Sequence, residues 1–238
     1  SQDKDGINIV ISDDSKSNDI KNLVYENNFF KSGKIQYKKN NPSLGAVKNW
    51  NSLIKYSKSE YLFILHQDEC PVSLNFYSEL KKVIIDNNKP DLIFLRCAHI
   101  FFRGMYSPYM TSKFVKLVLN LIPQYILLRN VVGSPSNIIF KKSTAQKFDD
   151  DLQWLVDVDW FFSFLKKNLS WISAPKLKIL SVVDNNTSIT KSISSNIKSI
   201  LLKEAEYLKN KHQNLFVFRL INPKNTYDFI LSQIESLI

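Results

Sequence analysis

Short apolar runs alternate with amphipathic stretches through residues 7–100. Four of these runs, each followed by polar or turn-forming residues, predict buried strands at 7–11, 34–37, 61–65 and 91–96. Three stretches between them repeat their apolar residues at helical spacing and predict helices at 18–28, 46–57 and 76–87. Strands that alternate with helices in this way indicate an α/β fold with a mostly parallel central sheet.

The second half of the chain repeats this pattern less regularly. Residues 103–129 are rich in aromatic side chains and are interrupted by Pro108 and Pro123. Two more strands are predicted, at 137–140 and 178–183, and three more helices, at 154–167, 195–210 and 226–238. The last two helices suggest a helical extension over residues 191–238 that follows a main domain over residues 1–190.

The composition is that of a globular protein with a basic surface. Of the 238 residues, 44% are hydrophobic and 13% are aromatic, which supplies a sizeable core and excludes a disordered or fibrous chain. The net charge of +10 favours an anionic partner. Because the lysines are scattered and no run of five basic residues occurs, we expect a polyanionic substrate or an anionic membrane surface rather than a nucleic acid.

One apolar stretch bears on membrane contact. Residues 114–128 include lysine, asparagine, proline and glutamine, and the stretch is too short and too polar to cross a bilayer. With Lys113 and Lys116 at its start, it is compatible with peripheral contact. No basic-then-apolar leader opens the chain, and Cys70 and Cys97 lie beside apolar runs, as buried thiols in a reducing compartment would. We therefore expect a cytoplasmic protein that can lie at the inner face of a membrane.

The glycines exclude the usual phosphate-binding loops. The sequence has five, at Gly6, Gly33, Gly45, Gly104 and Gly133, and they form neither a GxGxxG nor a GxxxxGK[ST] pattern. A phosphate group would therefore have to be held by a metal ion, by side chains or by isolated backbone amides.

Acidic residues gather at three places along the chain. Two pairs follow predicted strands and one opens a predicted helix: Asp13 with Asp14, Asp68 with Glu69, and Asp157 with Asp159. Because the carboxyl ends of parallel strands lie along one edge of a sheet, we expect the first two pairs to reach the same ligand. Neighbouring carboxylates suit Mg²⁺ or Mn²⁺ rather than Zn²⁺, and such an ion usually completes its ligand shell with phosphate oxygens. A diphosphate is therefore the expected ligand.

Each acidic pair also has a purely structural interpretation. The first two pairs suit turns and helix N-caps, where Asp is common. The third pair lies in the first turn of a helix, where the macrodipole favours negative charge. These alternatives remain open from the residues alone.

Five segments follow one another in an order typical of a known enzyme family. They are 9–15 (IVISDDS), 40–51 (NNPSLGAVKNWN), 61–69 (YLFILHQDE), 133–142 (GSPSNIIFKK) and 154–160 (WLVDVDW). Taken together they resemble the motifs of family 2 glycosyltransferases with the GT-A fold, over roughly residues 7–190. The resemblance implies a GT-A-like, Rossmann-like α/β domain. Its residues 1–100 would bind a nucleotide-sugar, and its residues 101–190 would bind the acceptor.

The resemblance also implies roles for the donor-binding residues. Asp13 or Asp14 would contact the nucleotide base, and Lys48 would face the base or the pyrophosphate. His66 would lie beside the donor, and Asp68 would bind the Mg²⁺ or Mn²⁺ that bridges the diphosphate.

On the acceptor side, the resemblance implies that Asp157 is the general base on the acceptor hydroxyl. Four further residues would line the acceptor: Gly133, Ser134, Trp154 and Asp159. The implied reaction is inverting transfer of a sugar from a nucleotide-diphosphate donor to a saccharide or lipid-linked acceptor. The implied setting is the synthesis of a bacterial surface polysaccharide such as an O-antigen or capsule.

The sequence departs from the family pattern in two places. His66 stands at the first acidic position of the D-x-D motif, so one negative charge near the ion is lost, although an imidazole can still contact a ribose hydroxyl or a metal. The family also has one more strand and helix before the strand at 7–11, and only six residues precede that strand here. Two alternatives follow: a non-catalytic nucleotide- or sugar-binding module, and a nucleotidyltransferase, which the missing glycine loop disfavours.

Overall fold

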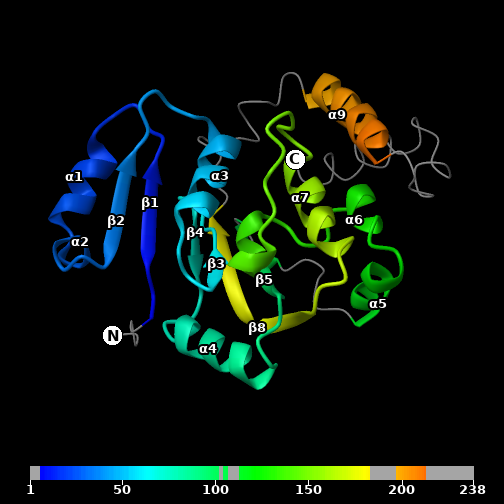
Figure 1. The fold of residues 1–238 in the computed structure, drawn as a ribbon, viewed down its shortest axis with the longest axis horizontal. Coiled ribbons are helices and arrows are strands. Elements are labelled where there is room, and N and C mark those ends of the chain that lie inside the picture. The colour runs from blue at the N-terminus through cyan, green and yellow to red at the C-terminus, as the bar shows by residue number, and fades with distance from the viewer. Residues whose placement is uncertain (1–5, 102–103, 107–112, 183–196, 213–238) are drawn as a thin grey trace.

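A computed structural model describes residues 6–101, 104–106, 113–182 and 197–212, and these form two separate sheets with helices around them (Figure 1). The smaller sheet has two parallel strands, β1 (Ile9–Asp13) and β2 (Ile35–Lys39). Helices α1 (Asp19–Glu26) and α2 (Asn28–Lys31) connect these strands. Because β2 lies beside β1 in register, Asp13 at the end of β1 pairs with Lys39.

The larger sheet has six strands in the order β3–β7–β5–β8–β4, with β6 paired to β5. Their bounds are β3 (Tyr61–Phe63), β4 (Glu69–Pro71), β5 (Leu92–Phe101), β6 (Gly104–Tyr106), β7 (Ile138–Lys141) and β8 (Trp171–Val182). The α/β class is confirmed, but the strand directions are more mixed than a mostly parallel sheet. Only β1–β2 and β5–β8 pair in parallel among the described strands, and each of these pairs is connected through helices, which supply the crossover that parallel pairing requires.

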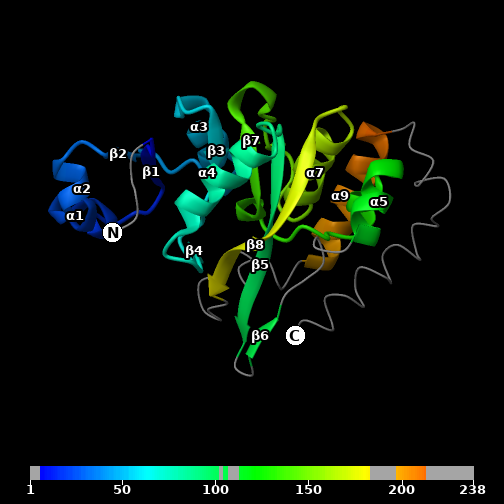
Figure 2. The same cartoon turned by 90° about the horizontal axis from the view of Figure 1, so that it is seen from below.

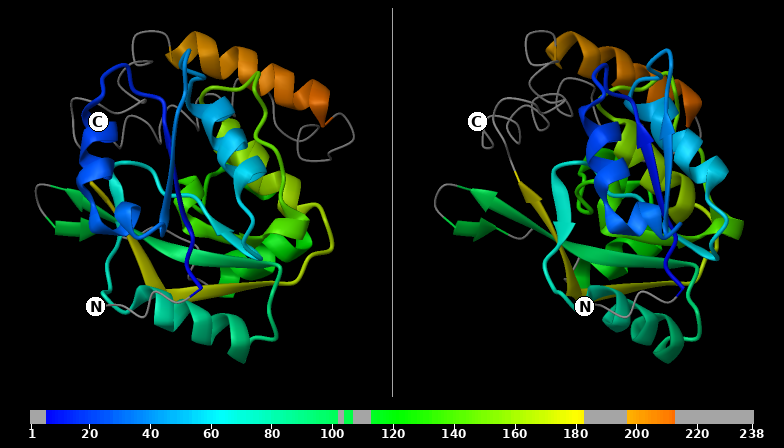
Figure 3. Two further views of the ribbon diagram at one scale, coloured as in Figure 1. Left: turned by 60° about the vertical axis from the view of Figure 1, so that its left-hand side comes forward. Right: turned by 90° about the vertical axis from the view of Figure 1, so that its left-hand side faces the viewer.

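Helices cover both faces of the larger sheet (Figures 2 and 3). The face covered by α4 (Phe76–Asp86) packs Phe76 against Ile93 and Leu95. The opposite face is covered by α3 (Ala46–Tyr56), α6 (Tyr125–Leu128), α7 (Val156–Leu165) and α9 (Ile197–Lys211), and α5 (Lys113–Leu121) precedes α6. Leu92 and Phe94 pack on this second face, so β5 alternates its side chains between the two layers, as a strand must.

Aromatic residues around α7 form the centre of the core. Trp160 is fully buried and stacks on Phe148 with ring centroids 4.2 Å apart. It also meets Phe140 of β7 nearly perpendicularly, at 5.3 Å. Aromatic pairs of this kind contribute about 0.5–1.5 kcal/mol each beyond the area they bury. This packing fixes α7 against the sheet, and with it the first turn that carries Asp157.

Helix α9 belongs to the same core. It lies beside α7 (Figure 1) and contributes Leu201 and Leu208 to the cluster that contains Trp160. The helix predicted at 195–210 is therefore confirmed, with bounds of Ile197–Lys211. The helix predicted at 226–238 lies outside the described residues, and the domain boundary at residue 190 stays a prediction.

The helix predicted at 18–28 is divided in two. Asn27 has an extended backbone with φ −74° and ψ 131°, which ends α1. Its side chain accepts a hydrogen bond from the backbone N of Phe29 at 2.9 Å and so caps α2. Asparagine favours such turns because its side chain competes with the helical backbone for hydrogen bonds.

Strand bounds differ from the predicted ones because of long-range pairing. β5 continues beyond the predicted 91–96 to Phe101, and β8 begins at Trp171 rather than at 178, because these two strands pair along most of their length. Cys97 of β5 is buried as expected, whereas Cys70 of β4 is exposed. Within the described ranges, no helix has the length and apolar character that crossing a membrane requires.

Candidate active site

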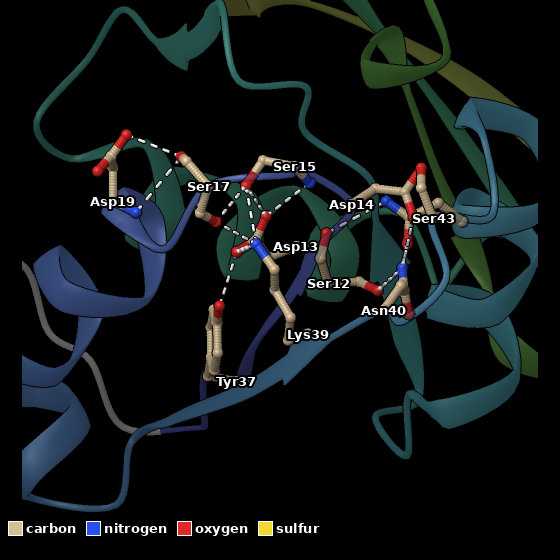
Figure 4. Close-up of polar contacts among 11 residues, drawn as sticks. Ser12, Asp13, Asp14, Ser15, Ser17, Asp19, Tyr37, Lys39, Asn40 and Ser43 are labelled. Atoms are coloured by element: carbon tan, nitrogen blue, oxygen red, sulfur yellow. Dashed lines mark hydrogen bonds and ion pairs between the residues drawn. The ribbon is translucent and has the colours of Figure 1, made fainter.

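Asp13, the last residue of β1, is buried and holds the end of the smaller sheet together (Figure 4). One carboxylate oxygen accepts hydrogen bonds from the backbone N and the Oγ of Ser15, at 2.8 and 2.6 Å. The other accepts from Tyr37 OH at 2.6 Å and from Lys39 Nζ at 3.0 Å. Burial alone would raise the pKa of Asp13, but these donors outweigh it and lower the pKa to about 2. The carboxylate is therefore ionised and already satisfied within the chain.

Asp14 points away from Asp13 and binds the loop that leads into α3 (Figure 4). Its carboxylate accepts from Ser43 Oγ at 2.6 Å and from the backbone N of Leu44 and Gly45 at 2.7 and 2.8 Å. Asn40 Nδ2 is a fourth donor, at 3.0 Å. Burial opposes these bonds, but their sum lowers the pKa of Asp14. Because the N-cap residue Gly45 has no side chain, Asp14 supplies the negative charge that the start of α3 favours.

A second group of polar side chains lies at the turn between β3 and β4. His66 follows β3 and stacks on Trp50 of α3, with ring centroids 4.9 Å apart and an interplanar angle of 19°. Glu69 begins β4, and its Oε2 accepts from the backbone N of His66 at 3.1 Å and lies 3.4 Å from the Nδ1 atom. The stacking and the carboxylate together fix the orientation of the imidazole ring.

The loop between α6 and β7 reaches Glu69 from another direction. Ser134 Oγ donates to Oε1 of Glu69 at 2.6 Å and lies 2.6 Å from Ser136 Oγ. Gly133 has a φ of +95°, and a Cβ atom there would lie 2.7 Å from Nδ2 of Asn137. Both the backbone conformation and the close approach therefore require glycine at this position.

Asp157 lies in the first turn of α7, and its carboxyl group is short of partners. Its Oδ1 atom is buried and has no hydrogen-bond partner among the described residues. Burial raises the pKa of Asp157, and the negative charge of Glu69 raises it further, to about 7. Near neutral pH this carboxyl group can therefore either hold or release a proton.

Three buried polar atoms lack a hydrogen-bond partner in the part of the chain that the structure describes: His66 Nε2, Asn137 Oδ1 and Asp157 Oδ1. An unpaired buried polar atom costs about 1–3 kcal/mol, so such atoms call for an explanation. These three come from three different elements that meet around Glu69. We call His66, Glu69, Ser134, Asn137 and Asp157 the central site, and its unpaired atoms favour ligand binding there.

Asp68 and Lys48 are the other predicted donor-binding residues. Asp68 is partly exposed in the turn between β3 and β4, and Lys48 is exposed on α3. Neither side chain forms a hydrogen bond or an ion pair with the residues that the structure describes. In the same residues, no group of three or more His, Cys, Asp or Glu side chains could by itself hold a metal ion.

Trp154 and Asp159 lie on either side of Asp157 but are bound to α9. Asp159 is buried, accepts from Lys211 Nζ at 2.8 Å and lies 2.8 Å from Nε2 of His212. The Trp154 side chain is partly buried and packs against the main core. The carboxylate of Asp159, like that of Asp13, is therefore already used within the chain.

The predicted site residues fall into two groups rather than one. Because β1 and β3 belong to different sheets, the expectation that Asp13 and Asp68 follow strands of a single sheet is corrected. Helix α3 connects the two groups. Its Asn49 donates to the backbone O of Ser12 at 3.1 Å, and its Trp50 stacks on His66.

The sequence assigns no individual role to three residues that the structure makes prominent. Glu69 belongs to a predicted acidic pair, but the family motif assigns the metal to Asp68. The importance of Asn137 becomes visible only in the folded loop, where its side chain contacts Ser134. No local signal marks Glu204, because the backbone amides that it binds lie about fifty positions earlier in the chain.

An open groove with a volume of about 550 Å³ lies outside the central site. It runs between the second half of α3 and residues 145–147, and Lys38, Lys55 and Tyr56 line part of it. Lys38 Nζ lies over the Tyr56 ring, 4.0 Å from its centroid. None of the predicted site residues lines this groove.

No protein-family model and no curated protein matches the sequence. Solved structures do match the fold. S. aureus TarS 1–349 matches with a TM-score of 0.57 and 13% identity, over 94% of this chain and 61% of that chain. A longer S. aureus TarS structure matches with a TM-score of 0.58 and 13% identity, over 96% of this chain and 38% of that chain. GalNAc-T7 with UDP, GalNAc and Mn²⁺ matches with a TM-score of 0.53 and 14% identity, over 82% of this chain and 41% of that chain.

These matches define the class of fold. TarS and GalNAc-T7 are glycosyltransferases of the GT-A type, so the chain has a GT-A-like fold, as its sequence motifs implied. The chain spans between 38% and 61% of the length of the chains it matches. At 13–14% identity the likeness is one of fold, and the chemistry has to be argued from the site.

Proposed function

We propose that this protein is a glycosyltransferase that moves a sugar from a nucleotide-diphosphate donor to a saccharide or lipid-linked acceptor, with inversion. The observation that carries the proposal is Asp157, which combines a buried unpaired oxygen with a pKa of about 7 at the central site of a GT-A-like fold. A general base needs both a free oxygen and a pKa near the working pH.

The proposed step begins with the acceptor hydroxyl beside Asp157. As the acceptor oxygen bonds to the anomeric carbon, the hydroxyl proton passes to the Asp157 carboxylate. The bond from that carbon to the diphosphate oxygen breaks on the opposite face, so the configuration inverts. General-base assistance of this kind is worth ~10²–10⁴-fold in rate. Glu69 supports the step because its negative charge helps to keep the pKa of Asp157 high.

The residues at the β3–β4 turn fit a divalent cation. Asp68 offers a carboxylate with no partner among the described residues, and His66 offers the unpaired Nε2 atom. Mg²⁺ and Mn²⁺ are commonly held by one or two protein groups together with substrate phosphates. GalNAc-T7 was solved with both UDP and Mn²⁺, which supports a similar ion here. Bound at Asp68, the ion would neutralise charge on the departing diphosphate.

Calorimetric titration with UDP and Mn²⁺ tests the donor half of the proposal. We expect metal-dependent binding by the wild type and its loss in Asp68→Ala. Asp86→Ala is the matched control, because Asp86 is an exposed aspartate at the end of α4. An unchanged titration of the Asp68→Ala variant would remove this residue from donor binding, and a parallel panel of nucleoside diphosphates identifies the base.

One observation favours the alternative of a non-catalytic nucleotide- or sugar-binding module. The carboxylates of Asp13 and Asp14, to which the family motif assigns the nucleotide base, already accept four hydrogen bonds each within the chain. A panel of nucleotide-sugars with Mn²⁺ separates the two functions. Release of a nucleoside diphosphate supports the enzyme, whereas measurable UDP binding without any release supports the module.

We also propose that the acceptor is lipid-linked, in the synthesis of a surface polysaccharide such as an O-antigen or capsule, at the inner face of a membrane. The His66-Gln67-Asp68 variant of the motif and the net charge of +10 support this setting. The exposed side chains of Leu117 and Leu121, one turn apart on α5, offer an apolar contact. Flotation with vesicles should recover the protein with anionic phospholipids and not with neutral ones. Equal recovery with both, or with neither, would contradict the membrane contact.

A further inference from the structure

The start of α7 has no cap of its own. Leu155 is the N-cap residue, and its apolar side chain accepts no hydrogen bond from the first turn. The first backbone N–H groups of a helix have no partner within it, and burying them unpaired costs free energy. At α7 the part that is held from elsewhere is the loop just before the helix: the backbone N–H groups of residues 153–155 donate to an acceptor from α9, about fifty residues later in the chain.

Glu204 of α9 binds three consecutive backbone N–H groups at this point. Its carboxylate accepts from the N of Gln153 at 2.6 Å, of Trp154 at 3.0 Å and of Leu155 at 2.7 Å. The Glu204 side chain is buried, with 6% of the residue exposed. A carboxylate is suited to this place because the start of a helix carries a partial positive charge.

The position of Glu204 on α9 is unusual for a residue that only packs a helix against a core. Its neighbours on the same helical face, three residues before and four residues after, are Leu201 and Leu208, each 2% exposed. A third apolar residue there would pack α9 without the cost of burying a charge. Packing alone therefore does not explain the carboxylate. Its hydrogen bonds to the loop before α7 do, because they order that loop.

A second attachment lies further along the same helix. Lys211 Nζ donates to Asp159 of α7 at 2.8 Å and also pairs with Asp149 of the loop. Tyr207 OH donates to the same Asp149 carboxylate at 2.8 Å. Helix α9 thus holds the entering loop and the first turn of α7 at several points on either side of Asp157.

Asp157 itself depends on this arrangement. Its Oδ1 atom has no hydrogen-bond partner among the described residues, so its direction follows largely from the backbone of the first turn of α7. We propose that Glu204 is a positioning residue, which holds from α9 the loop that leads into this first turn and so orients Asp157 and Trp154 toward the acceptor. The proposal rests on the proposed glycosyl transfer and adds a role for α9 within it.

The test compares Glu204→Gln with Glu206→Gln. Both residues are glutamates on α9, but Glu206 is exposed, so the second variant is a matched control. Glutamine keeps one acceptor oxygen and nearly the same volume, which should let the Glu204→Gln variant fold. Three readouts are needed: thermal unfolding, amide hydrogen exchange over residues 150–158, and transfer kinetics together with UDP affinity.

For Glu204→Gln we expect faster exchange of the amides of residues 153–155, and a turnover at least tenfold lower. UDP affinity should stay within about twofold of the wild type, because the donor-binding residues lie on other elements. Glu206→Gln should match the wild type in all three readouts. Unchanged exchange at 153–155, or an equal loss of turnover and UDP affinity, would overturn the positioning role.

A second variant separates this proposal from the proposed function. Lys211→Met removes the attachment at Asp159 and Asp149, and should speed exchange over the same residues and lower turnover without a loss of UDP affinity. If the wild type turns over no nucleotide-sugar, the glycosyltransferase proposal fails on its own. Hydrogen exchange in the Glu204→Gln variant then still decides whether α9 orders the start of α7.

Discussion

The end of β1 and the central site each hold an aspartate with at least one buried carboxyl oxygen, and the pKa values of these two aspartates depart in opposite directions from the ordinary value. Asp13 receives four hydrogen bonds, and its pKa falls to about 2. Asp157 keeps a buried oxygen unpaired, and its pKa rises to about 7. Burial pushes both pKa values upward, so the supply of donors makes the difference.

The two carboxyl groups therefore differ in what they can do. A carboxylate that is fully bonded inside the chain stabilises the fold and has little left to offer a ligand. A carboxyl group that the fold buries without donors lowers stability and remains available for a proton or a substrate. We therefore interpret the end of β1 as a structural network and the central site as the place of the reaction.

The largest expected effect is on turnover in Asp157→Asn. The amide cannot take a proton, so turnover should fall at least ~10²-fold while UDP affinity is retained. Stability at pH 8 should be unchanged or higher, because a buried group that resists ionisation has been replaced by a neutral one. Asp151→Asn, at an exposed position in the loop before α7, is the control. Near-normal turnover in Asp157→Asn would exclude this residue as the base.

The two carboxyl groups should also give opposite dependences of stability on pH. The pKa of Asp13 is about 2 when folded and 3.8 ordinarily, so its contribution of about 2 kcal/mol is complete above pH 3.8 and is lost as the pH falls toward 2. The pKa of Asp157 is about 7 when folded, so the free energy of unfolding should decline as the pH rises from 3.8 through 7.

Denaturant unfolding between about pH 2 and pH 8, without metal or nucleotide, measures both effects. Asp13→Asn should lower the free energy of unfolding by about 2 kcal/mol at pH 7 and flatten its acid limb. Asp157→Asn should remove the decline between pH 4 and pH 8. The same slope in both variants and in the wild type would show that neither carboxyl group is perturbed as described.

The sequence predicted the fold well because its signals are local. The alternation of short apolar runs with amphipathic helices defined the α/β class, and the order of the five motifs pointed to GT-A, which the solved structures support. The direction of each strand was harder to predict from the sequence, because pairing such as that of β3 with β7 joins residues far apart in the chain. The division into two sheets has the same cause.

The sequence pointed to some residues of the candidate site but not to the partners that they contact. The motifs pointed to His66, Asp68 and Asp157, and their roles stay predictions. What the motifs could not supply are the partners: Tyr37 and Lys39 for Asp13 come from a different strand. Partners from distant elements decide whether a carboxylate is satisfied or left free, and no pattern of adjacent residues encodes them.

A smaller effect is expected from Gly133→Ala, which tests the loop of the central site. The new Cβ would lie 2.7 Å from Nδ2 of Asn137 at a φ of +95°, so we expect a loss of about 1–3 kcal/mol in thermal unfolding. Gly33→Ala is the matched control, because Gly33 also has a positive φ, +74°, but no atom within 4 Å of the new Cβ. Its loss should be smaller. Equal losses would mean that the close approach of the new Cβ to Asn137 does not contribute to the loss of stability.

The smallest effect, in Asp14→Asn, gives the sharpest test of the contrast between the two regions. Asp14 accepts from the backbone N of Leu44 and Gly45 just before α3, so replacing its carboxylate by an amide should lower the free energy of unfolding by about 1 kcal/mol. Asp19→Asn, an exposed acid in the first turn of α1, should cost less. UDP affinity decides the interpretation. If it is unchanged, the role of Asp14 is to hold the loop before α3. If UDP affinity falls in Asp14→Asn as it does in Asp68→Ala, the end of β1 binds the donor as well, and the two regions form one site.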